Sequence, residues 1–256
     1  NIVGFMPRVL GVIPARLASS RLPEKMLLAE TGKPLIQYAW EAAVRAKSID
    51  EVLIATDSTD IAEAAHEFGA WVVMTGKHPS GTERAAEAVS TVSNVDVVVN
   101  IQGDEPEIDP KDLDALVGLL RDNPGDEMAT LAAPLTAWDD VVSEDCVKVV
   151  CASDGRALYF SRSVIPSASC WRDDSRLVCG YIQESPWKLH VGVYAYRKEF
   201  LVSYPSLPAG VLGRYECLEQ LKALEAGATI RVGMIGSVAV GIDTREDYDA
   251  FIGRVL

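Results

Sequence analysis

Short apolar runs alternate with longer amphipathic segments along the first half of the chain. The strongest run, residues 96–102, is Asp-Val-Val-Val-Asn-Ile-Gln and predicts a buried strand. Buried strands that alternate with helices are typical of an α/β fold with a mainly parallel sheet and helices on both faces. The expected strands are residues 9–13, 51–56, 71–74, 96–102 and 128–135, and the expected helices are residues 34–46, 59–68, 82–92 and 110–121.

The second half of the chain has a different pattern. Residues 148–152 and 156–160 flank a Ser-Asp-Gly turn, which predicts a hairpin. Residues 163–186 are irregular and rich in Ser, Asp and Trp, which indicates an excursion from the sheet, either an interface arm or a lid. Strands are also expected at residues 189–196 and 229–235, and helices at residues 214–226 and 244–255, the last of which begins with the capping-box pair Thr244 and Asp247.

The length and composition of the chain fit one domain. Its 256 residues are 48% hydrophobic, so we expect a single domain over residues 9–256. Residues 1–8 form an N-terminal extension, and Met6 is a candidate natural start that would make residues 1–5 foreign to the natural protein. No stretch approaches the roughly 18 consecutive apolar residues of a membrane span, so no membrane partner is expected.

Charge and cysteine content narrow the class of partner and the compartment. A net charge of −13 argues against a nucleic-acid partner, because binding to nucleic acid depends on many basic contacts. A small anion requires only a local basic cluster. The five cysteines are odd in number and contain no Cys-x-x-Cys pair, which argues against a disulfide framework or a zinc site and favours the cytoplasm.

A basic loop follows the first expected strand. It carries Arg16, Arg21 and Lys25, and the carboxyl ends of strands in open α/β sheets are where ligands bind. Guanidinium groups bind phosphate oxygens in pairs, and lysine adds a mobile point charge. The loop therefore predicts a polyphosphate site, with a solvated basic loop as the alternative.

Two aspartates are candidate metal ligands. Asp104 follows the strongest strand and should lie at the same edge of the sheet as the basic loop, where it can hold Mg²⁺ that bridges phosphate oxygens. Asp243 precedes the last helix and could hold the same ion from the other side. The alternative for both is a turn residue that caps backbone amides.

Two other groups of residues suit an organic ligand. Ser80 and Gly81 open a helix, where free amides suit an anion or the edge of a base, although Ser-Gly-Thr is also an ordinary helix start. His190 and Tyr194 lie on one face of a strand, with room left by Gly192, and suit a polyhydroxylated ligand, although a histidine more often fills a core or surface position. Arg162, Glu219 and Gln220 are ambiguous when taken singly.

Six motifs occur in a characteristic order along the chain. They are IPARLASSRLPEK (13–25), ATD (55–57), HPSGTER (78–84), VNIQGDEP (99–106), ALYFSR (157–162) and GIDT (241–244). Together they closely resemble the cytidylyltransferases of 3-deoxy-manno-octulosonate (KDO), which activate this sugar acid for bacterial lipopolysaccharide synthesis. The resemblance extends from about residue 9 to the end of the chain.

The resemblance implies a nucleotidyltransferase-type domain with a dimer-forming excursion. It implies a CTP-binding part over residues 9–150, a sugar-binding and dimerisation part over residues 151–240, and Mg²⁺ as cofactor. Arg16, Lys25 and Asp104 would be catalytic. The implied ligands are Arg16, Arg21, Lys25, Ser80, Gly81 and Gln102 for the nucleotide, Asp104 and Asp243 for Mg²⁺, and Arg162, His190, Tyr194, Glu219 and Gln220 for the sugar.

The implied reaction is attack of the KDO 2-hydroxyl on the α-phosphorus of CTP, which gives CMP-KDO and pyrophosphate. Two loops depart from the family pattern: Glu24 and Met26 flank Lys25 where Gly and Pro are usual, and residues 210–213 read Gly-Val-Leu-Gly where Ser-Pro-Leu-Glu is common. The alternatives are a related acceptor, such as 8-amino-KDO, a nonulosonate or a uridylyl acceptor, and a non-catalytic nucleotide-binding homologue.

Overall fold

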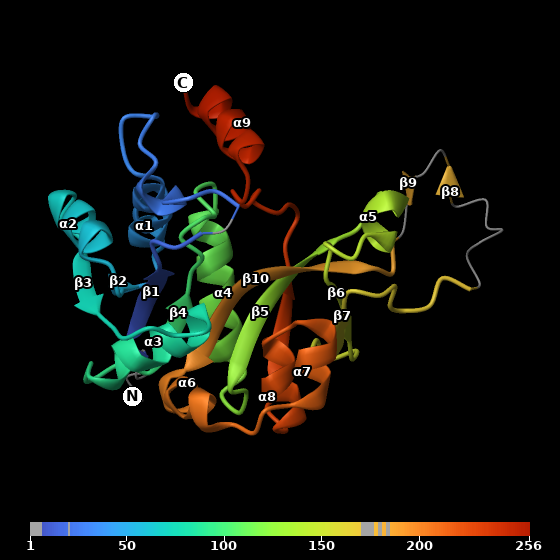
Figure 1. The fold of residues 1–256 in the computed structure, drawn as a ribbon. Coiled ribbons are helices and arrows are strands. Elements are labelled where there is room, and N and C mark those ends of the chain that lie inside the picture. Colours follow the sequence, from blue (N-terminus) through green and yellow to red (C-terminus); the bar gives the residue numbers. More distant parts are fainter. Residues whose placement is uncertain (1–6, 20, 170–176, 179–180, 183–184) are drawn as a thin grey trace.

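A nine-stranded sheet forms the centre of the computed structural model, which describes residues 7–19, 21–169, 177–178, 181–182 and 185–256 (Figure 1). Seven strands follow the order β11 (Ile230–Met234), β5 (Met128–Pro134), β10 (Lys188–Arg197), β4 (Val97–Asn100), β1 (Val9–Ala15), β2 (Glu51–Thr56) and β3 (Trp71–Met74). Four of the six pairings in this order are parallel, and β10 runs antiparallel to both β4 and β5. The expected mainly parallel α/β sheet is therefore confirmed.

Helices cover both faces of the sheet because alternate side chains of each strand point to opposite sides. Val9 and Ile13 of β1 pack into the core under α1 (Leu35–Arg45), α2 (Thr59–Glu67) and α4 (Pro110–Asp122). Leu10 and Val12 pack on the other face. That face is covered by α3 (Gly81–Ser90), α6 (Lys198–Ser203) and α8 (Gln220–Glu225).

The expected helix caps are present. Asp109 accepts a hydrogen bond from the backbone N–H of Lys111 at the start of α4, and Pro110 occupies the first turn. Thr244 and Asp247 form a capping box at the start of α9 (Arg245–Val255). α9 lies on the side of the sheet toward which β1 runs (Figure 1), and its Tyr248 packs in a small apolar cluster with Leu22 and Leu35. The remaining short helices are η1 (Lys25–Leu27), α5 (Trp138–Val142) and η2 (Tyr204–Ser206).

The single helix expected over residues 214–226 is wrong. Two helices, α7 (Val211–Glu216) and α8, replace it. Cys217 between them has a φ of 54° and a ψ of 44°, in the left-handed region, and the N–H of Leu218 bonds to the oxygen of Gly213. A left-handed residue ends a helix, but it is usually glycine, and no glycine marks this position in the sequence.

The expected hairpin is present, whereas the expected excursion is described only in part. β6 (Lys148–Cys151) and β7 (Ala157–Ser161) form the expected hairpin, and β6 joins it to β10. The expected arm or lid at residues 163–186 lies partly outside the described residues, as do residues 1–6 of the N-terminal extension. Within the excursion, β8 (Leu177–Val178) pairs with β9 (Tyr181–Ile182). No helix in the described part of the chain is long and apolar enough to cross a membrane.

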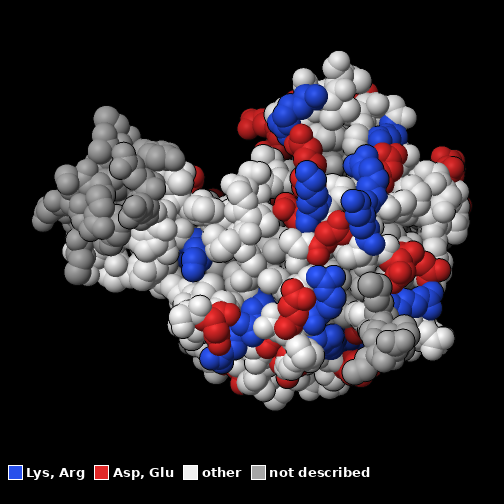
Figure 2. Space-filling model, turned by 180° about the vertical axis from the view of Figure 1, so that it is seen from behind, with Lys and Arg blue, Asp and Glu red and all other residues white. Residues whose placement is uncertain are grey.

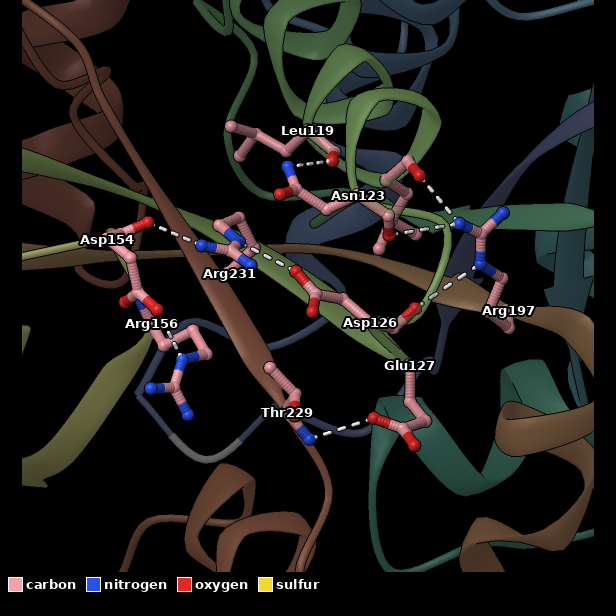
Figure 3. Close-up of polar contacts among 10 residues, drawn as sticks. Leu119, Asn123, Asp126, Glu127, Asp154, Arg156, Arg197, Thr229 and Arg231 are labelled. Atoms are coloured by element: carbon pink, nitrogen blue, oxygen red, sulfur yellow. Dashed lines mark hydrogen bonds and ion pairs between the residues drawn. The ribbon is translucent and has the colours of Figure 1, made fainter. Parts of the chain in front are cut away.

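A polar network fixes the edge of the sheet at which β5 and β11 begin (Figure 3). Arg231 bonds to Asp126 with 2.6 Å between Nε and Oδ2, and both side chains are largely buried. Arg197, at the end of β10, donates to the oxygens of Leu120 and Asp126. These contacts hold β5, β10 and β11 in register, at the edge opposite to that where β1 and β4 end.

Candidate active site

Two adjoining clefts lie at the edge of the sheet where β1 and β4 end. Their volumes are about 240 Å³ for the first cleft and about 500 Å³ for the second. The residues that line both clefts are Gln102, Asp104 and Asp243. The two clefts therefore share one polar wall.

The sequence candidates separate between these clefts. The first cleft is lined by every expected nucleotide ligand: Arg16, Arg21, Lys25, Ser80, Gly81 and Gln102. The second cleft is lined by every expected sugar ligand: Arg162, His190, Tyr194, Glu219 and Gln220. The structure thus brings each set together, while the ligand that each residue contacts stays a prediction.

Lys25 lies between the two candidate metal ligands. Its Nζ lies 2.5 Å from Oδ2 of Asp104 and 3.0 Å from Oδ1 of Asp243, and it also donates to the oxygen of Ile242 at 3.0 Å. Lys25 is buried, and Arg21 pairs with the other oxygen of Asp243 at 2.9 Å. Asp104 and Asp243, which are far apart in the sequence, therefore converge on one cation.

The oxygen atoms around the ammonium group of Lys25 are of the kind that binds a magnesium ion. They are two carboxylate oxygens and one carbonyl oxygen, and hard oxygen donors are the ligands that Mg²⁺ prefers. Among the described residues there is no group of three or more His, Cys, Asp or Glu that could hold a metal. A site with two carboxylates fits an ion that takes its remaining ligands from phosphate and water.

Glu24, which stands where glycine is usual in the family pattern, has an unusual backbone conformation. Glu24 has a φ of 54°, in the left-handed region that glycine adopts most easily. Its side chain is exposed and lines a neighbouring hollow with Asp57 and Lys77, not the first cleft. Glu24 therefore affects the backbone of the loop more directly than the charge of the first cleft.

The nucleotide side of the site is built from a helix start and a strand end. Ser80 caps α3 by accepting a hydrogen bond from the N–H of Glu83. A Cβ on Gly81 would lie 3.1 Å from Pro14, so a larger residue would crowd the first cleft. Gln102 is held by a hydrogen bond from its Nε2 to the oxygen of Gly192.

The face formed by His190 and Tyr194 is largely removed from water. Their ring centroids lie 5.4 Å apart, and Nε2 of His190 lies 3.0 Å from the hydroxyl of Thr130. Burial lowers the pKa of His190 to about 3, so its ring is neutral at physiological pH, and burial raises the pKa of Tyr194. A Cβ on Gly192 would meet no atom within 4 Å, which confirms the room expected beside this face.

The other wall of the second cleft comes from the end of β7 and the start of α8. Nε of Arg162 donates to the main-chain oxygen of Glu216. Gln220 is buried, and its Nε2 has no partner in the described part of the chain. Burial raises the pKa of Glu219, the residue before it.

Several cleft residues were missed by sequence reasoning. Glu105 lines the second cleft, and burial together with the charge of Asp104 raises its pKa to about 7. His78 and Arg84 line the first cleft, and Arg84 pairs with Asp57 at 3.1 Å. These three cleft residues all lie inside the six motifs, so the motifs carried a signal for each of them.

On the face shown in Figure 2, Lys and Arg side chains are interleaved with Asp and Glu side chains. The described residues on this face form no continuous basic surface of the kind that binds a nucleic-acid backbone. The clustered cations of the first cleft thus belong to a local site in an acidic protein.

Comparisons with known proteins agree on one family. The family model described as cytidylyltransferase matches residues 10–230. A 3-deoxy-manno-octulosonate cytidylyltransferase of Rhodopirellula baltica is 42% identical over 247 residues, which cover 95% of this chain and 97% of that protein. A protein of the same name from Solibacter usitatus is 44% identical over 246 residues, which cover 95% of this chain and 93% of that protein.

Solved structures give the same result. A CMP:2-keto-3-deoxy-manno-octonic acid synthetase complexed with CTP matches with a TM-score of 0.88 and 36% identity, and the match covers 96% of this chain and 98% of that one. A 4-diphosphocytidyl-2C-methyl-D-erythritol synthase from Anaerococcus prevotii matches with a TM-score of 0.60 and 14% identity, over 97% of this chain and 96% of that one. The second likeness shows a shared fold alone.

Proposed function

The chain belongs to the 3-deoxy-manno-octulosonate cytidylyltransferase family, and we infer from this membership that it transfers the cytidylyl group of CTP to KDO. The 2-hydroxyl oxygen of KDO attacks the α-phosphorus of CTP. The bond from that phosphorus to the oxygen that bridges to the β-phosphorus breaks, and pyrophosphate leaves. The product is CMP-KDO.

The wall shared by the two clefts is the observation that carries this proposal. A transfer between two bound substrates requires the attacking oxygen and the phosphorus to meet at one place. Gln102, Asp104 and Asp243 line both clefts, so a nucleotide in the first cleft and a sugar acid in the second cleft would meet along these side chains.

The cations of the first cleft suit the charge that the reaction must control. CTP carries several negative charges, and the leaving pyrophosphate gains charge as the bond breaks. Arg16 and Arg21 are exposed on the loop after β1, where Arg21 pairs with Asp243, while Lys25 is buried at the shared wall. We assign Arg16 and Lys25 the role of offsetting charge on the α-phosphate and the departing group, since fixed charges need no reorganisation during the reaction.

We also propose that the transfer requires Mg²⁺, held by Asp104 and Asp243. The convergence of two carboxylates and the carbonyl of Ile242 on one cation supports this assignment. When bound there, Mg²⁺ would offset triphosphate charge and help to orient the reacting groups. Asp104 would supply one ligand from the end of β4, and Asp243 the other from the turn before α9.

For the sugar acid, we propose contacts with Arg162, His190, Tyr194, Glu219 and Gln220. Arg162 can pair with the carboxylate of the acceptor. The neutral ring of His190 and the hydroxyl of Tyr194 can exchange hydrogen bonds with sugar hydroxyls. Gln220 offers an amide nitrogen that has no partner among the described residues. This mixture of one cation and several neutral polar groups fits a polyhydroxylated acid.

We further propose a cytoplasmic homodimer that serves lipopolysaccharide synthesis. Family membership supports the biosynthetic role, the dimer follows only from the resemblance of the motifs, and the absence of a Cys-x-x-Cys pair supports a reducing compartment. Light scattering of the purified chain over a range of concentrations tests the dimer; a single monomer mass at every concentration would contradict it.

Acceptor identity is tested by pyrophosphate release from CTP and Mg²⁺ with KDO, 8-amino-KDO or a sialic acid in parallel. We expect release with KDO well above release with the other two acids. Release that is fastest with another acid would assign the chain to a different acceptor. CTP binding without pyrophosphate release in the presence of any of the three acids would favour a nucleotide-binding protein that has no transferase activity.

A further inference from the structure

Glu216 lies at the end of α7 and makes a reciprocal contact with Arg162. Its Oε2 accepts a hydrogen bond from the backbone N–H of Arg162 at 2.9 Å. Its Oε1 accepts from the hydroxyl of Ser161 at 2.7 Å and from that of Tyr159 at 3.3 Å. In return, Nε of Arg162 donates to the main-chain oxygen of Glu216 at 3.0 Å. One glutamate thus fixes both the backbone and the side chain of Arg162.

Lys148 holds the main-chain carbonyl group of Arg162. Its Nζ donates to the main-chain oxygens of Arg162 at 2.5 Å, Cys146 at 2.6 Å and Ser143 at 2.7 Å. Lys148 is fully buried, and burial lowers its pKa. A buried ammonium group needs such acceptors, so the carbonyl of Arg162 is not free to turn away.

The chain that follows Glu216 lines the second cleft together with Arg162. The left-handed backbone of Cys217 ends α7 and directs residues 217–220 along the cleft. Tyr204 fixes this segment farther on, through a hydrogen bond from its hydroxyl to the oxygen of Glu219 at 2.6 Å. Glu216 therefore stands at the junction between Arg162 and the segment that carries Glu219 and Gln220.

We propose that Glu216 is a positioning residue for the acceptor: it couples Arg162 to residues 217–220 and so fixes where these residues lie in the second cleft. The proposal rests on the proposed function, because the acceptor that the cleft receives is taken to be KDO. Glu216 itself does not line the cleft. Its effect should thus reach the sugar acid only through the residues that it holds.

The variant Glu216→Gln tests this coupling, with Glu225→Gln as the matched control. Both carboxylate oxygens of Glu216 accept hydrogen bonds. Glutamine keeps one acceptor oxygen and replaces the other with an NH₂ group, which can only donate. Glu225 also binds α7 through its carboxylate, which accepts from the N–H groups of Val211 at 2.9 Å and Leu212 at 3.1 Å, but it does not contact the second cleft. The two variants thus disturb opposite ends of one helix.

For Glu216→Gln we expect the KM for KDO to rise about tenfold, since one charge-assisted hydrogen bond is lost, with the KM for CTP nearly unchanged. Glu225→Gln should leave both KM values near those of the wild type. Equal rises in both KM values for Glu216→Gln, or the same change in both variants, would show a general loss of structure and overturn the proposal.

Amide hydrogen exchange provides a second measurement that does not depend on activity. Glu216→Gln should speed exchange in peptides that contain Arg162 and residues 217–220, whereas Glu225→Gln should speed exchange only near the start of α7. Unchanged exchange at Arg162 and residues 217–220 would overturn the coupling. If the wild type released no pyrophosphate with KDO, the proposed function would fail. The exchange data would still decide whether Glu216 couples Arg162 to residues 217–220.

Discussion

Lys25 and Asp104 form an ion pair, with Nζ 2.5 Å from Oδ2, and the same ammonium group contacts Asp243. The lysine thereby holds two carboxylates together that would otherwise repel each other at the shared wall. A divalent ion that binds these carboxylates must compete with this positive charge.

Replacing Lys25 with methionine should therefore strengthen metal binding in the absence of nucleotide. We expect the affinity for Mn²⁺, measured by electron paramagnetic resonance, to rise about tenfold, because a unit charge beside a divalent ion is removed. Turnover should fall in the same variant, since Lys25 would no longer offset phosphate charge. Lys33→Met removes a different lysine that pairs with Glu41, and it should change neither quantity. Weaker Mn²⁺ binding by Lys25→Met would contradict this account.

Asp104→Asn should remove most activity without unfolding the protein. The substitution takes one charged ligand from the shared wall, and we expect kcat to fall by about a hundredfold or more. Circular dichroism should remain that of the wild type. The control is Asp249→Asn, which breaks an exposed pair with Arg245 on α9. Near wild-type turnover of Asp104→Asn at limiting Mg²⁺ would contradict the assignment of Asp104 as a magnesium ligand.

The half-buried ring of His190 predicts a pH dependence of stability. Its pKa falls from 6.5 to about 3 on folding, so the unfolded chain binds more protons than the folded chain between these values. This group therefore makes the free energy of unfolding rise with pH from about 3 to 6.5. Urea unfolding measures the difference in the free energy of unfolding between pH 5 and pH 7. This difference should be smaller for His190→Gln than for the wild type. The control His66→Gln, on the exposed side of α2, should not reduce it. An equal pH difference in wild type and His190→Gln would show that the ring is not shielded from protons.

The left-handed backbone of Glu24 predicts which substitutions the loop tolerates. Glycine reaches a φ of 54° without strain, so Glu24→Gly should keep the free energy of unfolding within about 1 kcal/mol of the wild type. Valine is β-branched and strained in this region, so Glu24→Val should lower it by about 1–2 kcal/mol. Thermal or urea unfolding compares the three proteins. A valine variant as stable as the glycine variant would show that the loop does not hold this conformation in solution.

Local patterns allowed much of the fold to be predicted. The β-branched residues of β4, the cap at Asp109 and the capping box at Thr244 each act over a few neighbouring residues, so their sequence signals survive into the structure. The break at Cys217 was not predictable, because a cysteine in the left-handed region has no sequence signal. The place of β10 between β4 and β5 depends on long-range pairing and was not predicted either.

The candidate site was predictable in its residues but not in its contacts. The family resemblance pointed to Asp104 and Asp243, yet only the folded chain shows Lys25 between them. Glu216 gave no signal, since a glutamate in a helix usually faces solvent. Its importance arises from the turn at Cys217, which brings the end of α7 against Arg162.

The most direct test of the central claim is ³¹P nuclear magnetic resonance of CTP and Mg²⁺ with the purified chain, recorded with and without KDO. We predict that the three CTP resonances give way to one phosphodiester resonance and the pyrophosphate resonance, and only when KDO is present. Conversion to CDP and inorganic phosphate, or consumption of CTP that does not depend on KDO, would contradict cytidylyl transfer at the wall formed by Gln102, Asp104 and Asp243.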